Sequence, residues 1–215
     1  MEARDVVHDA LDAGITLFDT AESYGGGKSE IYLGKALGPR RTNVVIATKF
    51  GWGGRHNRAT VENAFDASLR RLGTDYVDLY LLHHRDPDTP PEEIAAVMQD
   101  LVQAGKTRYW GVSNHSAAEV EAFLALAPVA GVEDYYNIAG SHCDQSGRSR
   151  VEIYEEEMIP LLEREQLGCL AFSPMDTGLL APPVPDDPAL AALTAVIDRV
   201  ADDINTRRAT LSVAL

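Results

Sequence analysis

The chain has 215 residues, enough to bury the core of one large domain. Its 33 acidic residues outnumber 19 Lys and Arg, and a net charge of −14 argues against a nucleic-acid partner, because phosphate binding needs a basic face. No apolar run approaches the roughly 18 residues of a membrane span, and no signal peptide precedes the first helix, so we expect a cytoplasmic protein without a membrane partner. Cys143 and Cys169 lack a metal-binding spacing, which favours reduced thiols.

Helix and strand patterns alternate along the chain. Apolar residues at helical spacing, bounded by capping residues, glycines or prolines, predict helices over 2–13, 29–37, 61–72 (capped by Thr60), 91–104, 116–127, 155–166 (bent or started at Pro160), 189–201 and 208–215. Short β-branched or apolar runs predict strands over 15–18, 44–48, 76–82, 107–112, 132–138 and 168–172. The fold class is therefore α/β.

Strands that alternate with single helices imply right-handed βαβ units and a parallel sheet. A doubly wound open sheet and an eight-stranded βα barrel both fit this pattern. No GxGxxG motif follows a strand, and Gly25–Gly26–Gly27 has the wrong spacing for one, which weakens the dinucleotide-fold alternative. We expect residues 1–215 to form a single domain.

Polar side chains recur just past the predicted strand ends. These residues are Asp19, Lys49, His83, Ser113, Asn114 and Ser173. In a βα barrel the carboxyl ends of the strands share one face, and that face holds the active site. Each residue alone has a structural explanation, but their repeated placement favours the barrel.

Asp19 and Tyr24 carry the first hypothesis about chemistry. Asp19 ends a buried strand, and Tyr24 lies five residues later at the edge of a glycine turn, which suggests an acid–base pair. The alternative is that Asp19 caps the turn and Tyr24 is an ordinary loop aromatic.

The chain resembles the aldo-keto reductase superfamily. The similarity rests on motifs that occur in order over nearly the whole chain: Phe18–Asp19–Thr20–Ala21 before Tyr24–Gly25, Ser29–Glu30 with Leu33–Gly34, Ala47–Thr48–Lys49–Phe50, Ser68–Leu69–Arg70–Arg71–Leu72, Asp78–Leu79–Tyr80 before His83, Gly111–Val112–Ser113–Asn114, and Phe172–Ser173–Pro174–Met175 with Gly178–Leu179–Leu180. The resemblance implies a TIM (β/α)8 barrel that reduces an aldehyde or ketone with NADPH.

In that family pattern Tyr24 is the general acid. A free tyrosine titrates near ~10, so proton transfer near neutral pH benefits from a cation that stabilises the phenolate. The resemblance implies that Lys49 supplies this charge and that Asp19 holds Lys49 in place. It also implies that His83 orients the substrate oxygen.

The same pattern assigns the cofactor site. It implies that Ser113 and Asn114 hold the nicotinamide carboxamide and that Phe172 stacks on the nicotinamide, although Phe172 fits a core aromatic equally well. Residues near the pyrophosphate are then Ser173, Pro174, Met175, Gly178 and Leu179. Trp52 and His84, just beyond Lys49 and His83, are candidates for the lining of the substrate pocket.

The chain departs from the family pattern in three places. Glu133 takes the position of a cofactor-binding glutamine, and an ionised carboxylate accepts hydrogen bonds but donates none. The connection 140–150 is long, and its His142, Cys143 and Asp144 raise a metal site as an alternative to an ordinary loop.

The third departure is that the chain covers only part of the barrel. Its patterns correspond to strands 2 to 7, and the first and eighth strands are missing. We therefore expect a chain truncated at both ends. The segment that binds the 2′-phosphate falls in the missing part, so NAD remains open beside NADP. A cofactor-binding regulatory subunit and an inactive fragment remain alternatives to a reductase. The oligomeric state is not predicted.

Overall fold

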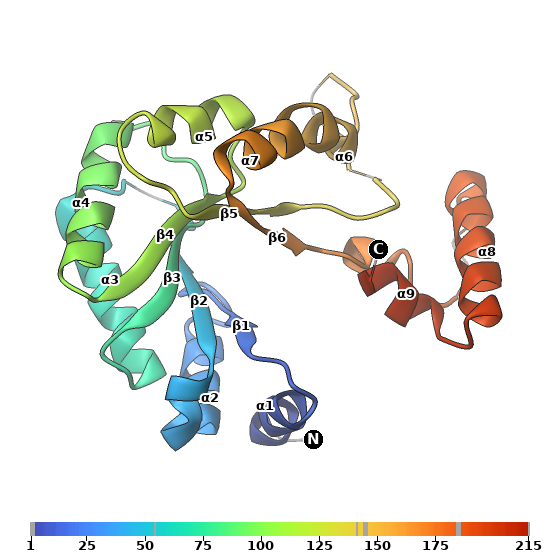
Figure 1. Ribbon diagram of the computed structural model, residues 1–215, viewed down its shortest axis with the longest axis horizontal. Helices are drawn as coiled ribbons and strands as arrows, with labels where there is room; N and C mark the ends of the chain where they lie inside the picture. The colour runs from blue at the N-terminus through green and yellow to red at the C-terminus, as the bar shows by residue number, and fades with distance from the viewer. Residues whose placement is uncertain (1–2, 54, 141, 144–145, 184–185, 215) are drawn as a thin grey trace. The chain divides into compact units, whose positions relative to one another are not determined.

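The computed structural model describes residues 3–53, 55–140, 142–143, 146–183 and 186–214, which form two compact units, Met1–Val132 and Glu133–Leu215. In the first unit helices and strands alternate: α1 Ala3–Asp12, β1 Leu17–Asp19, α2 Lys28–Leu37, β2 Val45–Phe50, α3 Arg58–Leu72, β3 Val77–Leu82, α4 Pro91–Gln103, β4 Thr107–Ser113 and α5 Ala117–Leu124 (Figure 1). Strand β5, Gly131–Tyr135, crosses the boundary between the units. The expectation of one domain over residues 1–215 stays a prediction.

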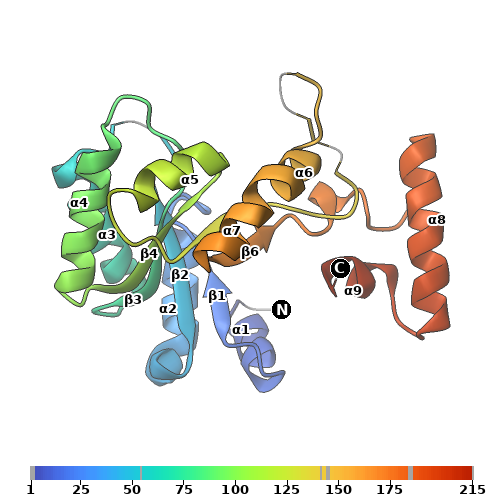
Figure 2. The ribbon, with the colours of Figure 1, turned by 45° about the horizontal axis from the view of Figure 1, so that its top comes forward.

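The second unit is built mainly from helices. It contains α6 Arg150–Ile153, a π-helical turn at Tyr154–Met158, α7 Ile159–Glu165, β6 Gly168–Phe172, α8 Pro188–Asp203 and α9 Arg208–Ala214. Helices α8 and α9 lie side by side (Figure 2). Their contact buries Ile197, Ala201 and Leu211 together with Leu180 from the preceding loop.

The sheet has the strand order β1-β2-β3-β4-β5-β6, and the pairs β1-β2, β2-β3 and β3-β4 are parallel. The α/β prediction is confirmed. In the register of the first unit Asp19 pairs with Ala47, and Lys49 pairs with Leu81. Because side chains alternate between the two faces of a strand, Asp19 and Lys49 lie on the same face of the sheet.

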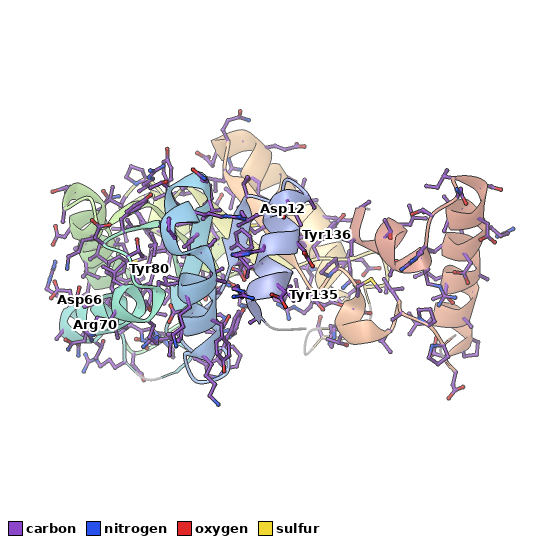
Figure 3. All side chains as sticks on the ribbon, turned by 90° about the horizontal axis from the view of Figure 1, so that it is seen from below. Asp12, Asp66, Arg70, Tyr80, Tyr135 and Tyr136 are labelled. Carbon is purple, nitrogen blue, oxygen red and sulfur yellow. The ribbon has the colours of Figure 1, made fainter. Side chains whose placement is uncertain are left out.

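The opposite face of the first unit's sheet is covered by helices. Tyr80 on β3 stacks on Phe50 at 4.9 Å between ring centroids and meets Phe65 of α3 edge-on at 4.6 Å. Asp66 and Arg70 lie on the outer side of α3 (Figure 3). There Asp66 forms an ion pair with Lys106, with 2.9 Å between Oδ1 and Nζ. The core of this unit therefore lies between the strands and helices such as α3.

Several boundaries differ from the sequence predictions, among them those of β1, which covers Leu17–Asp19 where 15–18 was predicted. Helix α3 begins at Arg58 and its cap is Asn57, whose side chain accepts a hydrogen bond from the Thr60 amide, so the prediction that Thr60 is the cap was wrong. Strand β2 continues to Phe50, which places Lys49 inside the strand. Strand β5 ends at Tyr135.

The helix predicted over 155–166 begins earlier. Ser149 caps α6 by accepting a hydrogen bond from the Val151 amide. The turn that follows is π-helical, and the Ile159 amide donates to the Tyr154 carbonyl, five residues back. Pro160 has no amide proton to continue the α-helical ladder, so a bend at this residue is expected on physical grounds.

Gly34 marks a close approach of α2 to the end of α3. A Cβ atom at this position would lie 2.1 Å from the Leu72 carbonyl oxygen, whereas one at Gly53 would meet nothing within 4 Å. We therefore expect Gly34→Ala to lower the free energy of unfolding by about 1–3 kcal/mol, despite the better helix propensity of alanine. Urea unfolding followed by tryptophan fluorescence measures this, with Gly53→Ala as the control. Equal stability of the two variants would contradict the close packing.

Candidate active site

Lys49 is the most deeply buried charged group of the site. Its side chain is 0% exposed, and its Nζ donates to both carboxylate oxygens of Asp19, at 2.5 and 2.6 Å, and to the Thr20 carbonyl at 3.0 Å. The parallel pairing of β1 with β2 brings these groups together from positions 30 residues apart. The ammonium is thus paired and hydrogen-bonded, as a buried charge must be.

Tyr24 approaches the same ammonium from the turn after β1. Lys49 Nζ lies 3.4 Å from the Tyr24 hydroxyl oxygen and 5.0 Å from the centre of its ring. Gly25, Gly26 and Gly27 all have positive φ, between 59° and 85°, a conformation that costs glycine little and other residues more. Three consecutive left-handed residues turn the chain sharply into α2 and leave Tyr24 37% exposed at the site.

His83 follows β3 directly and completes the cluster. Its ring meets that of Tyr24 edge-on at 5.7 Å, and the side chain is buried. Burial, reinforced by the charge of Lys49 and by His84, lowers the pKa of His83 from 6.5 to about 4. The imidazole is therefore neutral near pH 7, and among the described residues its buried Nδ1 makes no hydrogen bond.

The structure thus brings Asp19, Tyr24, Lys49 and His83 into one cluster within the first unit. Two further residues named from the sequence lie against it. The indole of Trp52 is 4.9 Å from the His83 ring and 4.7 Å from the His84 ring, and the two imidazoles stack at 4.8 Å. Trp52 is 62% exposed, so an aromatic surface faces solvent beside His83. Whether these rings line a substrate pocket stays a prediction.

Ser113 ends β4 next to this cluster, and Asn114 follows it. Asn114 has a φ of 60°, and its Nδ2 donates to the His83 carbonyl at 3.1 Å and to Ser113 Oγ at 2.9 Å. A serine hydroxyl that accepts one hydrogen bond still has its own proton to donate. Ser113 is buried, so its hydroxyl keeps a proton that can be donated at the end of the strand.

A second buried charge, Glu30, stabilises the turn at Gly25–Gly27 that carries Tyr24 (the tyrosine turn). The sequence motifs assigned Glu30 no role. Glu30 is fully buried and accepts hydrogen bonds from Thr48 Oγ1 at 2.7 Å and from Arg71 Nε at 2.5 Å. The Arg71 side chain in turn packs against Gly27, where an added Cβ would lie 2.7 Å from Arg71 Cδ. Glu30 therefore joins the turn that carries Tyr24 to the strand that carries Lys49. No local pattern reveals such a pairing across 41 residues.

The remaining cofactor candidates lie in the second unit, mostly in the loop after β6. Phe172 is half-buried, and its ring lies 6.2 Å from that of Tyr135. Pro174 and Met175 are also half-buried. The Ser173 hydroxyl accepts a hydrogen bond from the Thr177 amide, while the amides of Gly178 and Leu179 donate to carbonyls of the same loop. Their contact with a pyrophosphate stays a prediction.

Glu133 and the connection 140–150 complete the sequence-based candidates. Glu133 is buried in β5. His142 Nε2 lies 3.6 Å from Asp176 Oδ1, Cys143 forms an isolated bridge with Ser149, and Asp144 lies outside the described residues. Among the residues that the structure describes, no group of three or more His, Cys, Asp or Glu could hold a metal ion.

Comparison with known proteins places this geometry in a family. A family model described as "Aldo/keto reductase family" matches residues 1–195. The chain belongs to that family. It is 38% identical over 185 residues to the aldo-keto reductase YhdN of Bacillus subtilis (strain 168), which covers 82% of this chain and 53% of the relative. The chain thus spans about half the length of that curated relative.

Solved structures agree with this assignment. The glycerol dehydrogenase AKR11B4 from Gluconobacter oxydans superposes with a TM-score of 0.82 at 28% identity, covering 98% of this chain and 70% of that one. An aldo/keto reductase from Klebsiella pneumoniae, solved in complex with NADP and acetate, gives 0.78 at 29% identity, covering 97% and 68%. The six strands and their helices match part of the family's βα barrel, which confirms the predicted fold to that extent. Among the described residues no helix is long and apolar enough to cross a membrane.

The pKa of His83 gives a direct test of the cluster. We expect its imidazole to titrate at about pH 4 by NMR, because burial and Lys49 both disfavour its charged form. Since the unfolded chain takes up this proton near pH 6.5, His83 lowers stability as the pH falls from 6.5 towards 4 and has no such effect above 6.5. Lys49→Met should raise the midpoint, and neutralising exposed Lys28 should leave it unchanged. A midpoint near 6.5 in the unaltered chain would contradict the geometry.

The contacts of Glu30 with Thr48 and Arg71 predict that replacing its carboxylate, a change of one side-chain atom, lowers the stability strongly. Glu30→Gln leaves the guanidinium of Arg71, which is 25% exposed, without its anion, and we expect a loss of about 2–3 kcal/mol, less than for a fully buried pair. The matched control is Glu62→Gln, since Glu62 pairs with Arg58 on the surface and its loss should cost under about 0.5 kcal/mol. Urea unfolding compares the two variants, and similar losses would argue against this role of Glu30.

Proposed function

We propose that the chain carries the active site of an NAD(P)H-dependent reductase that converts an aldehyde or ketone to an alcohol. The observation that carries this proposal is the placement of Lys49 Nζ, held by Asp19, at 3.4 Å from the Tyr24 hydroxyl. A tyrosine beside a fixed buried cation is suited to release a proton, because the cation stabilises the phenolate that remains.

The residues act on the substrate oxygen. Tyr24 transfers its hydroxyl proton to that oxygen as the carbonyl becomes an alkoxide, and Lys49 balances the charge left on the phenolate. Asp19 keeps the ammonium in place and is itself held by β1. The neutral imidazole of His83 can donate one hydrogen bond to the same oxygen without competing for the proton, because its low pKa keeps it uncharged.

The donor set fits the carboxamide end of a nicotinamide cofactor. When bound, such a cofactor supplies the hydride that adds to the carbonyl carbon. The hydroxyl proton of buried Ser113 suits a carboxamide oxygen, and the amide of Asn114 donates a hydrogen bond to Ser113 Oγ. The NADP complex of the Klebsiella pneumoniae relative supports NADP(H) as the cofactor, with NAD as the alternative.

A regulatory subunit that binds the cofactor without turnover, and an inactive fragment, are the competing functions. The complete set of Asp19, Tyr24, Lys49 and His83 in one cluster favours catalysis, since nucleotide binding alone does not require a tyrosine beside a buried lysine. The physiological substrate is a small carbonyl compound of the kind on which the family acts.

The test is NADPH oxidation with nitrobenzaldehyde. We expect turnover by the 215-residue chain and a loss of about 10²–10⁴-fold in kcat/KM for Tyr24→Phe, because general acid catalysis contributes that much. Tyr32→Phe is the control, since Tyr32 is 52% exposed on α2 outside the cluster. Fluorescence titration with NADPH separates the alternatives: binding without turnover supports a regulatory role, and neither binding nor turnover supports an inactive fragment.

A further inference from the structure

A cavity outside the catalytic cluster lies between the loop joining β3 to α4 and helix α5. Its volume is about 360 Å³, within the range of small-molecule sites. The floor is formed by Leu82, Ile94 and Phe123, which are all nearly fully buried. Such a floor offers an apolar surface to a ring or a branched chain.

The wall of the cavity is preformed. Three of its residues are prolines, at positions 87, 90 and 91, whose φ angles are fixed. The carboxylate of Asp86 accepts hydrogen bonds from the amides of His56, at 2.8 Å, and Asp88, at 2.9 Å. Because hydrogen bonds and prolines already order this loop, a ligand that binds there causes little further loss of conformational entropy.

One polar group of the cavity lacks a partner. His115 is 7% exposed, and its Nδ1 lies 2.7 Å from the Ser113 carbonyl, so Nδ1 must carry the proton. Burial lowers the pKa of His115, and the neutral ring leaves Nε2 as an acceptor. Among the described residues Nε2 makes no hydrogen bond in the structure. The cavity therefore calls for a ligand that donates.

The charges around the cavity select the sign of that ligand. Three acidic residues, Asp86, Asp88 and Glu119, line it, against one basic residue, Arg85. Arg85 Nε pairs with Glu119 Oε1 at 2.8 Å, which uses one carboxylate and leaves an excess of negative charge. Anions are repelled by this excess, and a cationic donor is favoured.

We propose that this cavity is a binding site for small primary amines that carry an aromatic or branched apolar group. The apolar group packs on Leu82 and Phe123, and the ammonium donates to His115 Nε2 in the field of the surrounding carboxylates. This inference is independent of the proposed reductase activity.

The proposed amine site adjoins the Asp19–Tyr24–Lys49–His83 cluster along the chain. Leu82 immediately precedes His83, and His115 immediately follows Asn114, whose side chain donates to the His83 carbonyl at 3.1 Å. A ligand that displaces either cavity residue changes the surroundings of His83.

The experiment is a titration of the ¹⁵N-labelled 215-residue chain with 2-phenylethylamine, followed by amide chemical shifts. We expect saturable shifts at the cavity residues and at Asn114. The anionic analogue 3-phenylpropionate should bind at least about tenfold more weakly, as should the amine to His115→Phe, which keeps an apolar ring and removes the acceptor.

Two tryptophan variants on α5 locate the site. Ala122 lines the cavity, so Ala122→Trp should obstruct it and weaken binding by at least about tenfold. Ala118 is exposed on the same helix and is not part of the cavity lining, so Ala118→Trp should bind the amine normally. Binding that ignores Ala122→Trp, equal binding of the anionic analogue, or no saturable shift would each overturn the proposal.

Discussion

The burial of the Lys49 ammonium is the constraint on which the rest of the site depends. A fully buried cation costs several kcal/mol unless it is paired and hydrogen-bonded. Asp19 and the Thr20 carbonyl meet that need, and both come from the end of β1. A slip of one residue in the β1–β2 register would turn Asp19 to the other face of the sheet, so the ion pair and the register specify each other.

The turn that carries Tyr24, at Gly25–Gly27, is also held by contacts that do not involve Lys49. Three left-handed glycines make the turn possible. They also disfavour it, because glycine loses more conformational entropy on folding than other residues do. The Glu30–Arg71 pair offsets this entropy loss by packing under Gly27 and tying the start of α2 to Thr48. These contacts restrain the turn that brings the Tyr24 hydroxyl to 3.4 Å from Lys49 Nζ, while the Tyr24 residue stays 37% exposed.

The order of helices and strands, and the residues that meet in the Asp19–Tyr24–Lys49–His83 cluster, were predictable from the sequence, because both follow local rules; the catalytic role of the cluster stays a proposal. Apolar periodicity located every strand of the sheet, and polar residues at strand ends identified Asp19, Lys49 and His83. The Glu30–Arg71 pair and the unpartnered nitrogen of His115 were not predictable, since they depend on contacts between distant segments. The cap at Asn57 was missed because Thr60, three residues later, is an equally good capping residue by type.

One buried charge assigns different tasks to its two neighbours. Lys49 and burial act on His83 in the same direction, since both oppose a second positive charge, and the imidazole stays neutral near pH 7. The same charge disfavours the charged form of His83 but favours the charged form of Tyr24, because that form is an anionic phenolate. In the reduction proposed above, Tyr24 and His83 both approach the substrate oxygen, and two proton-bearing groups at one oxygen would otherwise compete. In the proposed reduction the field of Lys49 would separate them, so that Tyr24 gives up its proton and His83 keeps its own.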